Sequence, residues 1–370
     1  MKSFYIFFIL AVLSLQFYLY KSGTLQPSHI SFLVSFFIIT LLRGFSKSLV
    51  INKHFIRLIY FIFITLFINT TYAIIHFNFN YIISSSYYIF GIIVTYLILF
   101  FLTKSTYQNI LVSLLFITLI LLLVLWYFGY GNYEFRPRYN GFFNDPNQMA
   151  HWALCTLVMI VLLNDKNKII NYISLIMTMI IILLSLSRSG LLGLFVVSFT
   201  IFLPNKKNII IILSIIFLFY IFLYFYNFSD SIIFENFDSL ITRFIESDFG
   251  DQADARGYNR IYQYPEYLFF GSGQAEDYRF KSDFEIHSTW MGILFYYGIF
   301  TLTYFIYFLY KLFSNLNIFQ IGIIMGPLIY GFSTFGLRTP IFWMLIGVII
   351  YKSTENNYTT INKLSGFNVI

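Results

Sequence analysis

The sequence contains little charge. Asp, Glu, Lys and Arg make up 11% of its 370 residues, while apolar residues make up 59% and the mean hydropathy is +0.76. Average soluble domains contain about 25% charged residues, so this chain has too few ionisable groups to cover a water-exposed surface. The same apolar content excludes a disordered chain. The composition therefore predicts an all-α polytopic membrane protein.

Cysteine is also scarce. The only one is Cys155, so no intramolecular disulfide can form, and a disulfide-rich secreted scaffold is excluded. Because Cys155 lies in an apolar run, we interpret it as a small residue packed inside a helix. We find no internal repeat and no linker rich in Pro or Ser. We therefore expect a single integral membrane domain over residues 1–370.

Long apolar runs are abundant and define the predicted spans. A helix needs about 20 apolar residues to cross the hydrocarbon core. We place about 12 transmembrane helices near residues 3–20, 29–44, 55–75, 84–103, 108–128, 148–163, 169–186, 189–203, 208–227, 287–310, 318–335 and 339–352. The first run has no small-residue cleavage site after it, so we interpret it as an anchor rather than a signal peptide.

Lys and Arg are distributed unequally between the two predicted sides. With both termini in the cytoplasm, thirteen of the 23 basic residues lie on the cytoplasmic side, and eleven of these are Lys. The other ten lie outside, and eight of them are Arg. Fourteen of the sixteen acidic residues also lie outside, the exceptions being Asp165 and Glu355. Lys inside is ordinary membrane anchoring, whereas Arg gathered outside needs another explanation.

Arg suits bidentate recognition of phosphate and carboxylate groups. We therefore predict an outer site for an anionic ligand, the alternative being that these Arg residues pair with the outer acids. The outer candidates for contacts with a diphosphate or glycan are Arg136, Arg138, Arg188 and Arg279. Asn147 joins them, because Asp145 is expected to cap a helix that begins at Pro146, which would point Asn147 into the span.

One long outer loop, residues 228–286, separates the ninth and tenth spans. Its first part, residues 230–244, has apolar residues at helical spacing and predicts a supporting helix in the membrane interface. Further along, Arg256 and Arg260 are four residues apart, so a helix ending before Pro265 would present both guanidinium groups on one face. Residues 271–273, Gly-Ser-Gly, predict a flexible turn.

His287 follows the loop at the mouth of the tenth span. An ionisable residue that enters a membrane helix is a functional candidate, and His transfers protons near neutral pH. The alternative is an interfacial His bonded to a backbone carbonyl. Three acids of the loop, Asp248, Asp251 and Asp254, suggest a cation site, but isolated acids at this spacing are typical of a solvated loop. We therefore expect no metal.

Four segments in this order resemble the bacterial O-antigen polymerase and O-antigen ligase superfamily. They are residues 138–147 (RYNGFFNDPN), residues 185–190 (SLSRSG), the series Arg256, Arg260, Pro265 and Gly271–Gly273, and residues 287–292 with Gly298. Together with the twelve spans and the long outer loop they cover essentially the whole chain. Family members often have Asn after the His, where this chain has Ser288.

The resemblance implies a GT-C-like fold and glycosyl transfer without metal or cofactor on the periplasmic face of the bacterial inner membrane. It implies that His287, Arg256 and Arg260 are catalytic and that Arg188 contributes to activity. The implied partners are undecaprenyl-diphosphate-linked oligosaccharides, membrane lipids and a chain-length regulator, and no nucleic acid. Arg side chains would hold the diphosphate while His287 accepted a proton, and attack opposite the diphosphate would invert the anomeric carbon.

Three functions remain open at this point. An O-antigen polymerase would move the glycan to the non-reducing end of another lipid-linked repeat unit, and we favour it because of the low-charge composition with 48 Phe and 31 Tyr. A ligase would transfer the same glycan to lipid A–core. A flippase or transporter would instead place its ionisable residues near mid-membrane, whereas here the spans are almost free of charge and most Arg and acidic residues lie on the outer side.

Overall fold

The computed structural model of the protein describes residues 2–20, 24–43, 52–164, 167–202, 254, 256–275, 279–280 and 285–365. Within these ranges the chain is helical and has no strand, only isolated bridges in the hairpin between Asn132 and Gly141. The elements are α1 (Lys2–Leu13), η1 (Ser14–Gln16), α2 (Pro27–Arg43), α4 (Lys53–His76), α5 (Asn80–Phe101), α6 (Ser105–Tyr127), α7 (Pro146–Leu163), α8 (Lys168–Ser185), α9 (Arg188–Phe202), α13 (Asn259–Gln263), α14 (Tyr267–Phe270), α15 (Thr289–Phe313), α16 (Ile318–Tyr330), η2 (Gly336–Arg338) and α17 (Pro340–Ser365).

These helices agree with the expectation of a membrane-embedded bundle. Among the described residues, six helices are long and apolar enough to cross a membrane, namely α4, α5, α6, α7, α8 and α15. Four shorter apolar helices, α1, α2, α9 and α16, accompany them. The predicted span at 208–227 and the interfacial helix predicted at 230–244 lie outside the described residues, as do Asp248 and Asp251.

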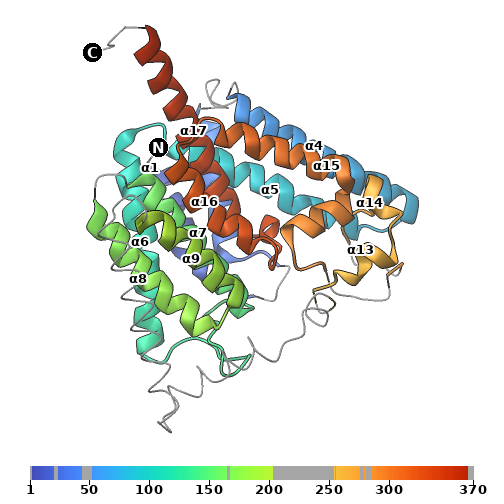
Figure 1. Cartoon of the computed structure of the whole chain (residues 1–370), viewed down its shortest axis with the longest axis horizontal. Helices are drawn as coiled ribbons and strands as arrows, with labels where there is room; N and C mark the ends of the chain where they lie inside the picture. Colours follow the sequence, from blue (N-terminus) through green and yellow to red (C-terminus); the bar gives the residue numbers. More distant parts are fainter. Residues whose placement is uncertain are drawn as a thin grey trace.

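Helix α7 is the centre of the bundle (Figure 1). Almost all of its side chains are buried, and it packs against α6, α8, α9, α16 and α17. The helix begins as the sequence predicts, because Asp145 accepts a hydrogen bond from the backbone N–H of Asn147 and Pro146 is the first helical residue. Cys155 of this helix is a free, buried thiol, as expected.

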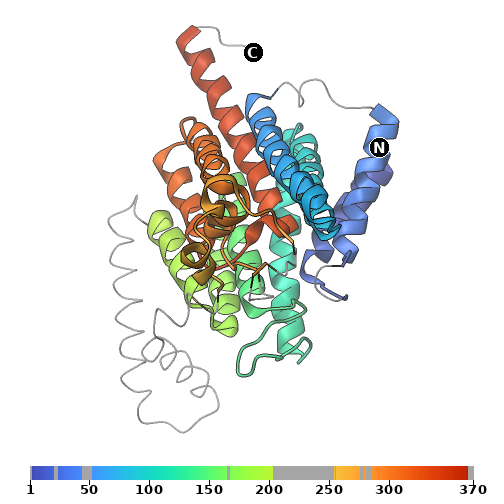
Figure 2. The ribbon, with the colours of Figure 1, turned by 90° about the vertical axis from the view of Figure 1, so that its right-hand side faces the viewer.

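The two ends of the bundle differ in charge. At one end, which we call the Lys end, α4 begins at Lys53, α15 carries Lys311 in its last turn and α17 carries Lys352. Hydrogen bonds from Asn52 to Thr354 (3.0 Å) and from Asn315 to Ser353 (3.2 Å) join these helices there. The last turns of α17 extend beyond the rest of the bundle in both views (Figures 1 and 2).

At the opposite end, which we call the Arg end, helices α7, α9, α15 and α17 all begin. Their N-termini carry partial positive charge from the aligned peptide dipoles. Arg188 is the first residue of α9, and Arg338 ends η2 just before α17 begins. Guanidinium groups and the N-termini of these four helices therefore lie at the same end of the bundle.

Helix α15 is broken at Gly298, which has φ 77° and ψ 171°. The carbonyl oxygens of Phe295 and Tyr296 accept hydrogen bonds from the backbone N–H groups of Ser272 (3.0 Å) and Gly273 (2.9 Å). Backbone that leaves the helical form within a membrane needs such partners. Gly271 and Gly273 of the predicted turn are at positive φ, and residues 271–273 are buried against the broken helix.

Candidate functional site

The connection from α16 to α17 is the meeting point of the Arg end. The hydroxyl of Tyr330 donates to the carbonyl oxygen of Asn147 (2.7 Å) and lies 3.0 Å from the Ser187 hydroxyl. The backbone N–H of Thr289 donates to the carbonyl of Gly331 (2.7 Å). Because Asn147, Ser187 and Thr289 belong to the starts of α7, α9 and α15, one short connection holds three helix N-termini together.

Arg138 and Asn147, both predicted from the sequence to contact the ligand, lie side by side. Arg138 donates through Nη2 to the side-chain oxygen of Asn147 (2.8 Å) and through Nε to the carbonyl of Ser185 (2.9 Å). The bond to Ser185 ties the loop before α7 to the end of α8. The amide oxygen of Asn147 is thus already used by Arg138, while its side-chain nitrogen is 3.4 Å from the Asp145 carboxylate.

Arg188 occupies the sharp junction between α8 and α9, which lies between the spans predicted at 169–186 and 189–203. Leu186 adopts a left-handed conformation there (φ 49°), which is uncommon for a residue with a side chain. The hydroxyl of Ser187 then accepts a hydrogen bond from the backbone of Gly190 (3.3 Å) and contacts Tyr330. The half-buried Arg188 therefore begins α9 directly beside the Tyr330 contact.

Arg256 and His287 are joined through their backbones. The N–H of His287 donates to the carbonyl oxygen of Arg256 (3.0 Å). The imidazole is exposed and the guanidinium half-buried, and neither side chain forms a hydrogen bond or ion pair with the described part of the chain. Arg256 and Arg138 both lie within electrostatic reach of the Tyr330 hydroxyl. The backbones that carry these two side chains therefore meet at the Arg end, and no side chain of the described residues binds either group.

Arg260 does not share a helical face with Arg256, so the prediction of one helix carrying both is wrong. Helix α13 begins only at Asn259, and Gly257, with φ 74°, separates Arg256 from it. A left-handed residue interrupts a right-handed helix. Arg260 is 4% exposed and its guanidinium lies over the ring of Phe280 (5.4 Å), so it is packed into the protein rather than presented beside Arg256.

The guanidinium of Arg279 is also held by other residues of the protein. Its Nη2 donates to the hydroxyl of Tyr81 (2.7 Å) and to the carbonyl of Ser272 (2.6 Å), and its guanidinium stacks on Tyr72 (4.9 Å) and Tyr267 (5.0 Å). It thereby fastens the segment around Ser272 to α4 and α5.

Arg136 lies apart from the other arginines that the sequence singles out. It is exposed in the hairpin between α6 and α7, and the described residues offer its side chain no hydrogen bond or ion pair.

The loop acid Asp254 is engaged with Tyr262. The phenol donates to the carboxylate (2.6 Å), and this hydrogen bond raises the pKa of Tyr262 above its usual value. Within the described ranges, no three His, Cys, Asp or Glu side chains are grouped as metal ligands would be.

Sequence reasoning overlooks a polar cluster that spans four separate segments. Glu285 pairs with Arg338 and accepts a hydrogen bond from Gln274 (3.1 Å), which in turn receives hydroxyl hydrogen bonds from Tyr88 (2.8 Å) and Tyr297 (2.7 Å). The available signal is the presence of charged residues at the mouths of two spans, Glu285 before α15 and Arg338 before α17. Their pairing is not visible in sequence because 53 positions separate them.

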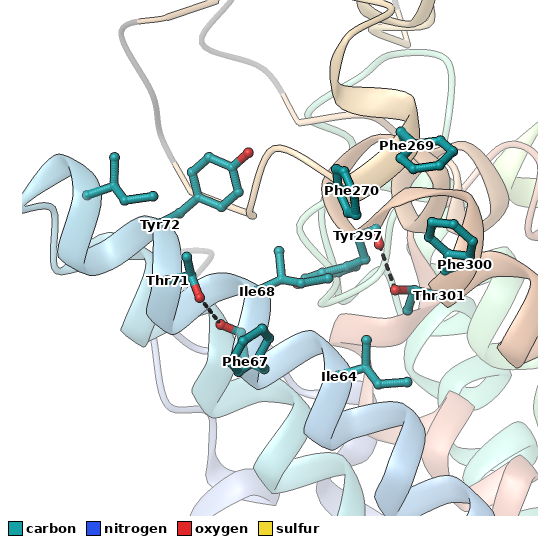
Figure 3. Close-up of a pocket in the computed structure, with 11 residues that line it drawn as sticks. Ile64, Phe67, Ile68, Thr71, Tyr72, Phe269, Phe270, Tyr297, Phe300 and Thr301 are labelled. Carbon is teal, nitrogen blue, oxygen red and sulfur yellow. Dashed lines mark hydrogen bonds between the residues drawn. The ribbon is translucent and has the colours of Figure 1, made fainter.

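An apolar groove of about 350 Å³ runs between α4 and the α14–α15 junction. Figure 3 shows Phe67 and Tyr72 of α4 on one side and Phe270 and Phe300 on the other. Phe67, Phe270 and Phe300 are exposed, at 65%, 69% and 58%. At one end of the groove, Tyr72 lies under the guanidinium of Arg279. The groove therefore combines a hydrocarbon-like wall with a cation at its rim.

Comparison of the chain with models of known protein families and with curated proteins gives no significant match.

Proposed function

We propose that the protein is a polysaccharide polymerase of the O-antigen type. In this proposal it spans the bacterial inner membrane about 12 times in a GT-C-like fold, with both termini in the cytoplasm and the Arg end facing the periplasm. The substrates are oligosaccharides linked to undecaprenyl diphosphate. The observation that supports this best is the pair Arg256 and His287 at the Arg end, joined through their backbones and with no side-chain hydrogen bond or ion pair to the described residues.

The chemistry divides between these two side chains. The hydroxyl oxygen of the acceptor sugar attacks the anomeric carbon of the donor, and the bond from that carbon to the diphosphate oxygen breaks. The diphosphate leaves with the bonding electron pair, and Arg256 stabilises its charge with support from Arg138 and Arg188. His287 accepts the proton of the attacking hydroxyl. Attack opposite the leaving group inverts the anomeric configuration.

A lipid-linked substrate also suits the groove between α4 and α15. Its exposed aromatic wall offers an apolar surface against which a polyprenyl chain packs by van der Waals contact. Arg279 at the rim carries the charge that a diphosphate would meet. A bilayer-embedded donor would thus approach the Arg end from the side of the bundle.

Analysis of lipopolysaccharide from a deletion strain tests this function. A polymerase predicts that loss of the gene leaves a single repeat unit on the core, with ladders restored by the wild-type gene. A core without any repeat unit would identify the ligase instead, because attachment itself would then be lost. Unchanged ladders in the deletion strain would contradict both functions.

A further inference from the structure

Glu285 lies at the centre of the polar cluster and is held by two partners. Arg338 forms an ion pair with its carboxylate, and Gln274 donates to the same oxygen (3.1 Å). Gln274 is fully buried, and its backbone N–H donates to Asn69 of α4 (2.9 Å). The cluster thereby links Glu285 to the membrane-embedded helices.

The ion pair is partly removed from solvent. The side chains of Glu285 and Arg338 are 26% and 31% exposed, and the Arg338 guanidinium lies 5.1 Å from the centre of the Tyr87 ring. Breaking such a pair from one side leaves a partly buried charge without a partner, which is costlier than removing both charges. The two residues are therefore expected to respond to substitution as a unit.

The segment from Glu285 to Ser288 is fixed at every residue. After Glu285, the backbone N–H of Ile286 donates to the Tyr296 hydroxyl (2.9 Å). Next, the N–H of His287 donates to the carbonyl of Arg256, and the Ser288 hydroxyl donates to Gly331 (3.2 Å).

Glu285 is the residue of this segment whose charged side chain anchors it to another element. The ion pair of Glu285 therefore helps to position His287, which follows two residues along the chain. It also helps to position Arg256, whose carbonyl accepts the backbone hydrogen bond of His287.

We propose that Glu285, Arg338 and Gln274 form a positioning clasp for His287 and Arg256. Glu285 does not exchange protons with substrate in this proposal. Its pairing with Arg338 fixes the path of residues 285–288, so that the imidazole and the guanidinium keep the relative placement that glycosyl transfer needs. This inference rests on the proposed function, and it adds three residues that act through others.

Single and double substitutions in purified protein test the clasp. Glu285→Gln and Arg338→Gln should each lower kcat at least about tenfold, because misplacement by about 1 Å costs up to about a hundredfold. The KM for the lipid-linked donor should stay within about twofold. The double variant should be no slower than either single variant. It replaces both charged groups by neutral amides, so neither charge is left without its partner. Glu355→Gln, in the ion pair with Lys352 at the Lys end, is the matched control and should change neither constant.

Hydrogen exchange supplies a readout that does not depend on activity. The backbone amides of residues 286–288 should exchange hydrogen faster in both single variants than in the wild type. Their exchange rates should be unchanged in Glu355→Gln. Unchanged exchange, unchanged kcat in the singles, or losses that multiply in the double would each overturn the clasp. A loss of kcat that is fully explained by a smaller fraction of folded protein would also overturn the clasp. Wild-type protein that transfers no glycan would refute the proposed function, while exchange would still test the clasp.

Discussion

At the scale of single residues, the arginines of the Arg end have different tasks. Arg138 binds Asn147, Arg260 is buried against Phe280, and Arg279 holds the segment at Ser272. Arg256 alone among these four has no side-chain hydrogen bond or ion pair with the described residues. A sequence cannot distinguish a structural Arg from one available to a ligand, because the difference lies in partners distant along the chain.

Arg256 should therefore be sensitive to a change that keeps its charge. Arg256→Lys should reduce glycan transfer at least about tenfold, since an ammonium group cannot form the planar, bidentate contact with a diphosphate. Arg57→Lys is the matched control, because Arg57 lies at the Lys end, and it should keep transfer within about twofold. Elongation assayed on purified proteins measures both. Equal rates for the two variants would remove Arg256 from the site.

At the scale of elements, the break in α15 decides how residues 271–273 are held. The loop segment at Ser272 and Gly273 takes the place of the missing helical turn by donating to the carbonyls of Phe295 and Tyr296. The close approach leaves no room for a side chain at Gly298, where a Cβ atom would collide with the backbone of Phe269. The break thus fixes the segment at Ser272 and Gly273 against α15.

Substitution of Gly298 tests this packing. Gly298→Ala combines a left-handed backbone with a steric collision, which together should cost more than about 2 kcal/mol. The apparent Tm in detergent should fall by about 4 °C or more. Gly129→Ala is the control, because Gly129 has a similar φ of 78° but open space around it. A Tm for Gly298→Ala equal to that of Gly129→Ala would show that the close approach does not contribute to stability.

At the scale of the whole molecule, charge sorted by type predicts the arrangement of the helices. The sequence places Lys53, Lys311 and Lys352 on one side and Arg138 and Arg188 on the other, and the bundle brings each of these two groups to one end. Local patterns also predict the start of α7 at Pro146 and the junction before Arg188, because caps and turn residues act within a few positions.

The remaining features depend on long-range contacts. The bond between Gln274 and Asn69 joins residues 205 positions apart, and no local pattern indicates it. The separation of Arg256 from Arg260 depends on the left-handed φ of Gly257. The four-residue spacing in the sequence does not indicate this backbone conformation. The break in α15 likewise required knowledge of the segment packed against it, since Gly298 alone is compatible with a continuous helix.

In the proposed mechanism, His287 accepts a proton during glycan transfer at the Arg end. The most direct measurement is elongation of an undecaprenyl-diphosphate-linked oligosaccharide by purified protein in liposomes, comparing wild type with His287→Ala. The exposed imidazole makes no hydrogen bond to the described residues, so its removal should leave the fold intact. We predict elongation by the wild type and a loss of about 10²–10⁴-fold in the variant. Equal elongation by both proteins would contradict proton transfer by His287, and no elongation by the wild type would contradict glycan transfer itself.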